Sequence, residues 1–239
     1  MRLRNYAPAL LKPFNDELTR KFLFALLFVD AVLLAIFITY NVLGLNHGDG
    51  LIAEQFWRFD IGLDLSFSEN FGFFKWTAIM VFMLASFLKK PNAMSVFIFA
   101  VFAILLADDS KQLHEHAGRF LRERVFGQVI ADPHAAQTIG ELVYFAGQGV
   151  VVVALLWLAY RFGSPEQRLY VLRFSASIFG LIICGVGFDA IHSVFEGAPL
   201  SWLLGLIEDG GEIVFASIAC GYGFSYLLAQ FQSAEVSHA

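Results

Sequence analysis

Cysteine, proline and charged residues are all scarce in this sequence. Of 239 residues, 2 are cysteine and 6 are proline, and only 15% are charged. Both cysteines, Cys184 and Cys220, lie inside apolar runs, which excludes a disulfide-rich secreted scaffold and a CxxC zinc or redox motif. The formal net charge is -5, and no Lys/Arg-rich tract is long enough to follow a phosphate backbone. A nucleic-acid partner is therefore excluded.

Sequence motifs for nucleophilic catalysis are missing as well. The chain contains no Gly-x-Ser-x-Gly, Gly-x-Gly-x-x-Gly, phosphate-binding loop or His-Glu-x-x-His. No lysine occurs after Lys111, so a Schiff-base lysine in a late span, as retinal attachment needs, is excluded too.

Hydrophobic residues are what the chain has in abundance. They make up 58% of the sequence, and the mean hydropathy is +0.65, which is typical of a protein whose solvent is lipid. A hydrocarbon core of about 30 Å needs roughly 20 apolar residues in a helix. This length predicts an all-α, polytopic helical membrane protein with about six transmembrane helices, at about 22–43, 71–88, 93–116, 138–160, 174–195 and 206–229.

Helix-breaking residues separate these segments. Three breaks stand out, at 89–92 (Lys-Lys-Pro-Asn), 163–165 (Gly-Ser-Pro) and 197–199 (Gly-Ala-Pro). We therefore expect a cytoplasmic N-terminal segment over 1–21, one helical-bundle domain over 22–230, and a short flexible tail over 231–239.

The distribution of basic residues predicts the orientation. Ten of the 16 lysines and arginines fall on the side of the N-terminus and six on the other, which favours cytoplasmic N- and C-termini. Arg119, Arg122 and Arg124 count against this orientation, since they follow the third span on the outer side. The expected localisation is the inner (plasma) membrane of a bacterial cell, with lipid as the constant partner.

Acids and histidines gather at the outer ends of four consecutive spans. Measured from the inner ends at 1.5 Å per residue, the first acid on each of these helices lies at about 24 to 30 Å, so one layer could hold them all. On the fifth span Asp189, His192 and Glu196 share a face at i, i+3 and i+7, and on the sixth Glu208 and Glu212 stack at i and i+4.

The third and fourth spans carry matching polar stripes. Asp108, Gln112 and Glu115 form one at i, i+4 and i+7, and Glu141 begins another on the fourth span. His114 lies about 120° away from the first stripe, so its ring needs a distortion of the helix or a different partner.

Desolvation decides what such a cluster requires. Adjacent carboxylates near the hydrocarbon must be protonated, hydrated or neutralised by a cation, because a buried charge costs several kcal/mol. Carboxylates and imidazoles bind iron, manganese and zinc. The sequence therefore predicts a divalent metal site, and with it a metal-dependent oxidoreductase or hydrolase acting on a lipid or small molecule, if the protein is an enzyme. The candidate ligands are Asp108, Asp109, His114, Glu115, Glu141, Asp189, His192, Glu196, Glu208 and Glu212.

The chain resembles a group of uncharacterised bacterial multispan membrane proteins in which an acidic pair precedes His-Glu at the end of a mid-chain span. The matching residues are Asp108-Asp109 with His114-Glu115, the acids Glu208, Asp209 and Glu212, and an acidic first outer loop with Asp64 and Glu69. The resemblance covers most of the chain and implies no activity. Where these relatives have Asp-Glu, this sequence has Asp-Asp, so the role of Asp109 does not carry over directly.

Three other interpretations remain open. Asp30 lies near the bilayer midplane, where an acid is typical of an ion path, so the cluster could be the mouth of a proton or cation transporter or channel. The cluster could instead be an interface, in an accessory subunit of a membrane complex or in a homo-oligomer. It could also be a hydrated polar cap, since helix dipoles favour acids at N-termini such as Glu141, although they disfavour Asp108 and Asp189 at C-terminal ends.

Overall fold

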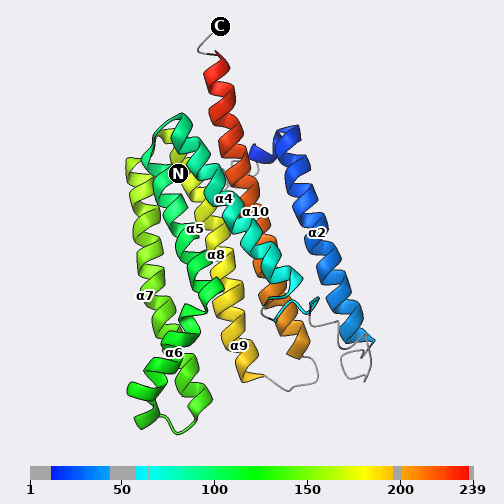
Figure 1. The fold of residues 1–239 in the computed structure, drawn as a ribbon, viewed down its shortest axis with the longest axis vertical. Helices are drawn as coiled ribbons and strands as arrows, with labels where there is room; N and C mark the ends of the chain where they lie inside the picture. Colours follow the sequence, from blue (N-terminus) through cyan, green and yellow to red (C-terminus); the bar gives the residue numbers. More distant parts are fainter. Residues whose placement is uncertain (1–11, 44–57, 64, 196–200, 237–239) are drawn as a thin grey trace, which may run out of the picture.

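The computed structural model describes residues 12–43, 58–63, 65–195 and 201–236 (Figure 1). Helices account for nearly all of this part of the chain, which contains no strand. The α-helices are α2 (Glu17–Val42), α4 (Phe67–Lys89), α5 (Ala93–Lys111), α6 (Leu113–Arg124), α7 (Pro133–Phe162), α8 (Pro165–Ile182), α9 (Asp189–Val194) and α10 (Ser201–Val236). The 3-10 turns η2 (Lys12–Asn15) and η4 (Phe126–Gln128) and the π-helix η5 (Ile183–Phe188) complete the list.

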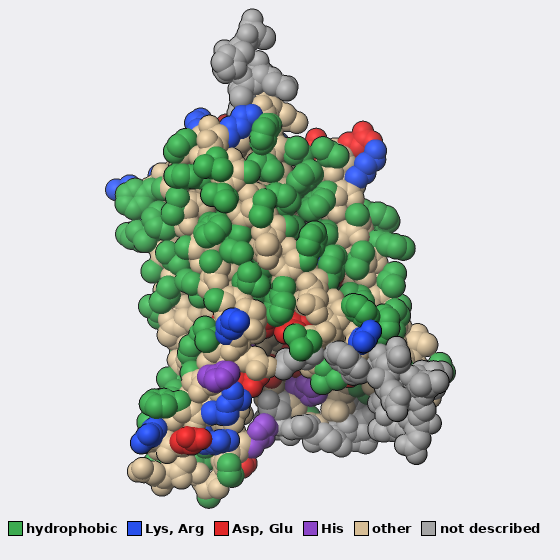
Figure 2. Space-filling view, viewed as in Figure 1, with side chains coloured by type: hydrophobic (Ala, Val, Ile, Leu, Met, Phe, Trp, Pro, Cys, Tyr) green, Lys and Arg blue, Asp and Glu red, His purple; other side chains and the backbone are tan. Residues whose placement is uncertain are grey.

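Six helical segments are long and apolar enough to cross a membrane. They are Glu17–Val42, Phe67–Lys89, Ala93–Lys111, Pro133–Phe162, Pro165–His192 and Ser201–Gln232, which confirms the predicted all-α fold and the number of spans. On the face seen in Figure 2 the side chains of the middle of the bundle are mostly apolar, and the charged ones gather toward its two ends. The protein is therefore a multi-pass membrane protein.

The last helix, α10, forms the centre of the bundle. It packs against α2, α4 and α8, while α5 lies between α4 and α7 on one side (Figure 1). The largest buried side chains, among them Tyr226, Phe102 and Phe174, form the apolar core beside α10. We call the end where α5 and α9 stop and α7 and α10 begin the acidic end; it lies at the bottom of Figure 1.

Capping residues explain where the helices begin. The Asn92 side chain accepts a hydrogen bond from the Ser95 N–H at 2.9 Å, directly after the predicted Lys-Lys-Pro break. Ser164 and Gln167 form a reciprocal capping box at the start of α8, after the predicted break at 163–165. These two predicted breaks are confirmed, and the third, at 197–199, lies outside the described residues.

Helix boundaries differ from the predicted spans because backbone hydrogen bonding, and not hydrophobicity, ends a helix. The first span begins at Glu17, inside the predicted N-terminal segment, and α10 continues to Val236, so the predicted tail is helical as far as that residue. The third span, predicted as one helix over 93–116, is interrupted at Gln112. The fifth begins at Pro165 and contains the π-helix η5 before Asp189.

Candidate functional site

A cavity of about 720 Å³ opens at the acidic end of the bundle. Its walls come from α4, α5, α6, α7, α8, η5, α9 and α10, so five of the six membrane-spanning segments contribute to it. Figure 2 shows acidic side chains in a recess between the apolar belt and the acidic end. The volume is typical of a pocket for a small organic ligand and exceeds the space that a single ion needs.

Most of the ionisable side chains in the cavity wall are acids. Eight carboxylates line it, together with two imidazoles, and the described lining residues include no lysine or arginine. The acids are Asp108, Asp109, Glu115, Glu141, Asp189, Glu208, Asp209 and Glu212, and the histidines are His114 and His134. We call the cavity lined by these acids and histidines the acidic pocket.

Most of the residues predicted from the sequence meet in this pocket. Eight of the ten candidate ligands line it, and His192 lies at its edge, bonded to Glu208. The tenth, Glu196, lies outside the described residues, as does Asp64. Sequence reasoning gave no role to His134 and did not include Asp209 among the candidate ligands, and both residues line the cavity.

A break between α5 and α6 places Asp108 and His114 together. Gln112 adopts a left-handed conformation, with φ 49°, which ends α5 and lets α6 start in a new direction. The His114 N–H then donates to Asp108 Oδ1 at 3.0 Å, and His114 Nδ1 lies 3.4 Å from the same oxygen. The expected distortion of the helix near His114 is thus confirmed.

The surroundings of His114 favour its protonated form. Burial of the ring disfavours the charged imidazolium, but the hydrogen bond and charge of Asp108, with the charges of Glu115 and Glu141, outweigh this effect and raise the pKa of His114. The ring also stacks on Phe145, with centroids 5.0 Å apart, so the imidazole is held at the pocket wall between α6 and α7.

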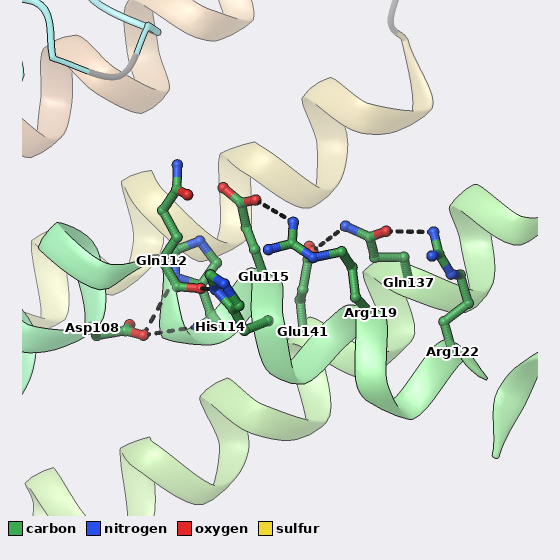
Figure 3. Close-up of polar contacts among 9 residues, drawn as sticks. Asp108, Gln112, His114, Glu115, Arg119, Arg122, Gln137 and Glu141 are labelled. Carbon is green, nitrogen blue, oxygen red and sulfur yellow. Dashed lines mark hydrogen bonds and ion pairs between the residues drawn. The ribbon is translucent and has the colours of Figure 1, made fainter. Parts of the chain in front are cut away.

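Hydrogen bonds fix the acids on the α6 and α7 side of the pocket. Glu115 forms an ion pair with Arg119 at 2.9 Å, which turns its charge partly toward the surface. Gln137 donates to Glu141 Oε1 at 3.0 Å and accepts from Arg122 Nη1 at 2.9 Å. Figure 3 shows this chain of contacts, with Gln137 between Arg122 and Glu141.

The π-helix η5 makes room for an acid on the opposite wall. Glu212 of α10 lies against Gly185, where an added Cβ would overlap the Glu212 carboxylate. The next glycine in the same π-helix, Gly187, has only the Ile182 carbonyl oxygen within 4 Å of such an atom, at 3.9 Å. One turn of α10 away, Glu208 Oε2 lies 2.8 Å from His192 Nδ1. Because π-turns occur frequently at functional sites, this location of η5 is informative.

The predicted metal site is not supported by the arrangement of these groups. Carboxylate and imidazole are suitable ligands for iron, manganese or zinc. However, in the described part of the chain no three His, Cys, Asp or Glu side chains are grouped closely enough to hold a metal ion. The acids instead surround the cavity, and several are paired with His or Arg.

The predicted ion-path residue Asp30 lies elsewhere, in the core between α2, α4 and α10. Its Oδ1 is 2.6 Å from Lys75 Nζ, its Oδ2 accepts from Ser217 Oγ at 2.5 Å, and Lys75 also donates to the Ile213 carbonyl at 2.8 Å. Both charged side chains are at most 1% exposed.

Lys75 was the partner that sequence reasoning missed. From the acidic ends of their helices, Asp30 lies about 18 Å inward and Lys75 about 12 Å inward. From the inner ends of the predicted spans, Asp30 lies at about 12 Å and Lys75 at about 20 Å, so the depth comparison that aligned the acids does not pair them. The signal in the sequence was a lone lysine within an apolar span.

Comparison with known proteins adds a family and no activity. A family model described as a domain of unknown function, DUF8692, matches residues 22–225. No curated protein matches the chain, and neither does any solved structure. This agrees with the resemblance to an uncharacterised group of membrane proteins. Because the match covers all six membrane-spanning segments at least in large part, the chain belongs to the DUF8692 family.

Proposed function

We propose that this membrane protein binds a cation in its acidic pocket. The observation that supports the proposal is the sign of the charge: eight carboxylates line one cavity, and no lysine or arginine is among its described lining residues. Carboxylates that are close together and partly removed from water repel one another, and a bound cation reduces that repulsion.

Three of the pocket acids contact basic side chains of the protein: Asp108 contacts His114, Glu208 contacts His192, and Glu115 contacts Arg119. Five more carboxyl groups surround the same space, those of Asp109, Glu141, Asp189, Asp209 and Glu212. A cation entering the pocket would therefore meet a strongly negative potential from several helices at once.

A divalent metal ion such as iron, manganese or zinc is the first cation to test, since the donor types suit it. The observed arrangement would have to contract to surround such an ion, because the described residues hold no ready group of three ligands. If a metal binds, it would supply Lewis acidity or redox chemistry, as in a metal-dependent hydrolase or oxidoreductase.

Cation binding can be measured directly on the purified protein in lipid nanodiscs. Equilibrium dialysis against Mn²⁺ or Zn²⁺ should show saturable uptake that falls at least tenfold in the triple variant Asp189→Asn, Glu208→Gln, Glu212→Gln. The control carries three neutralised acids outside the pocket wall, at Glu17, Glu123 and Glu166. Equal uptake by the two triple variants would place the bound metal elsewhere and count against a metal in this pocket.

A second candidate function, proton or cation translocation, is supported by the buried pair Lys75–Asp30. A smaller cavity of about 120 Å³ shares Trp76, Asp209 and Glu212 with the acidic pocket and reaches Ile213, whose carbonyl accepts from Lys75. Ionisable groups inside a membrane are typical of ion pathways. In liposome flux assays, the double variant Lys75→Met, Asp30→Asn, which buries no charge without its counter-ion, should abolish a translocation activity while leaving cation uptake by the pocket intact.

We propose that both termini are cytoplasmic and that the protein lies in a bacterial inner membrane, so that the acidic end faces outward. Labelling of single cysteines introduced at the two ends, with a reagent that does not cross membranes, tests this orientation. Size measurement of the detergent-solubilised protein and mass spectrometry of co-purified chains would test for a homo-oligomer or a larger membrane complex.

A further inference from the structure

The part of the cavity wall that lies away from the acids is apolar. An inorganic cation would have no use for this apolar surface. Toward the bundle interior it is formed by Leu105, Val152, Ile178 and Leu181. Val152, Ile178 and Leu181 are only 3 to 7% exposed. A cavity with acids at one end and aliphatic side chains at the other is amphipathic, and its best ligand is amphipathic as well.

The same cavity is open on one side between α7 and α8. Leu142 and Ala146 on α7 and Ile182 on α8 line the cavity and are nevertheless exposed, Leu142 by 40% and Ile182 by 45%. Beyond Ile182, η5 and α9 pack against α10, so the acidic-end part of this span is separated from α7. We call the gap between Leu142, Ala146 and Ile182 the lateral opening.

The lateral opening faces lipid. Leu142 and Ala146 belong to the span Pro133–Phe162, and Ile182 belongs to Pro165–His192. Ile182 lies about 10 Å from Asp189 along the helix, on the side of the bundle interior. This depth places Ile182 within the hydrocarbon layer, next to the acidic end. What contacts the opening from outside is therefore a membrane lipid or another membrane-dissolved molecule.

We propose that the ligand of the acidic pocket is a membrane amphiphile with an amine head group, which enters from the bilayer through the lateral opening. Its ammonium group lies among the carboxylates at the acidic end, and its hydrocarbon chain lies along Leu105, Val152 and Ile178. This inference rests on the proposed function, because it names the cation that the pocket binds.

Charge selects the head group. The cavity wall holds eight carboxyl groups and two histidines, and its described lining residues include no lysine or arginine, so histidine is the only basic partner that an anionic head group would find there. A phosphate or carboxylate head group would be repelled, whereas an ammonium group gains attraction from each nearby acid. The structure therefore favours an amine over the anionic and zwitterionic phospholipids that surround the protein.

Photo-crosslinking in phosphatidylcholine nanodiscs can test the proposal. The probe is a long-chain primary amine with a diazirine on its chain, and the matched control is a fatty acid with the same photoreactive chain. We expect the amine to label residues 142–149 of α7 and 178–186 of α8 and η5 at least tenfold more than the fatty acid does. Excess dodecylamine should suppress this labelling, and butylamine, which lacks the chain, should not.

A pair of tryptophan variants tests the route. Ala146→Trp fills the lateral opening, whereas Val150→Trp adds the same side chain at a lipid-facing position of α7 that does not line the cavity. Ala146→Trp should reduce amine labelling at least fivefold, and Val150→Trp should leave it unchanged. Both positions are exposed, so neither variant requires the core to repack.

The outcomes separate this inference from the proposed function. Equal labelling by amine and fatty acid, or equal labelling in the two tryptophan variants, overturns the inference. If Mn²⁺ or Zn²⁺ uptake depends on the pocket acids while the amine fails to label it, the cation site stands and the amphiphile is wrong. If neither the metals nor the amine binds, both proposals are wrong.

Discussion

Breaking the buried pair Lys75–Asp30 should destabilise the protein strongly. Lys75→Met removes the ammonium group and leaves the Asp30 carboxylate, 1% exposed, with the hydrogen bond from Ser217. Asp30→Asn keeps an acceptor for Ser217 but leaves the Lys75 charge with the Ile213 carbonyl. Each single change therefore leaves one charge buried without its counter-ion.

The expected size follows from the cost of an uncompensated buried charge. Removing one partner of a buried ion pair costs about 3–5 kcal/mol, or a factor of roughly 200 to 5,000 in the folding equilibrium. The double variant Lys75→Met, Asp30→Asn buries no charge, so its loss should be much smaller than the sum of the two single losses. A coupling of at least about 2 kcal/mol is expected for groups in direct contact.

Unfolding of the protein by sodium dodecyl sulfate in mixed micelles provides the free energies of unfolding for this cycle. Lys90→Met serves as the control, since Lys90 is an exposed cation and should change the stability by less than about 0.5 kcal/mol. Single variants that lose less than about 1 kcal/mol, or a double variant whose loss equals the sum, would refute the reasoning.

Two further predictions concern the acidic pocket. Gly185→Ala should displace the Glu212 carboxylate, which weakens cation uptake and lowers the stability by about 1–3 kcal/mol. The control Gly187→Ala, in the same π-helix, should change neither the uptake nor the stability. Equal effects of the two variants in dialysis and in thermal unfolding would contradict this prediction. Because the pKa of His114 is raised in the folded protein, its protonated ring contributes to the stability of the fold. This contribution is fully present below about pH 6.5, the ordinary pKa of histidine, and is lost as the pH rises through the higher pKa of the folded state. Melting temperatures of wild type and His114→Gln across this range should show a fall with pH that the variant lacks, and parallel curves would disprove the assignment.

Much of the fold could be predicted because the bilayer imposes a length on each helix. Six runs of about 20 apolar residues predicted the six spans, and the residues Asn92 and Ser164 marked helix starts that the structure contains. Boundaries were less accurate, as at α10, which continues to Val236 beyond the last apolar run.

The two irregular positions that shape the pocket could not be predicted in the same way. Gln112 adopts a positive φ without being glycine, so no residue type signalled the break after α5. The π-helix η5 depends on how α8 packs against α10, and its sequence reads as an ordinary apolar helix. The clustering of the acids, by contrast, followed from helix periodicity and depth alone.

The predicted metal site shows where residue types stop being informative. Acids and histidines at the correct depth were recognised, but a metal site needs at least three ligands around one point, and side-chain contacts decide that. Here Glu115 turns to Arg119 and His192 to Glu208, and no such group forms among the described residues. The result is an acidic cavity with room for a larger cation.

The most direct test of the central claim is cation binding by the acidic pocket. Thermal unfolding of the protein in nanodiscs should be measured with Mn²⁺, with Zn²⁺ and with dodecylamine, for wild type and for the variant Asp189→Asn, Glu208→Gln, Glu212→Gln. Binding predicts a stabilisation of wild type by at least one of these cations, about 2.7 kcal/mol at a concentration 100 times the Kd, that the variant lacks. The absence of any stabilisation, or an equal one in both proteins, would contradict the account.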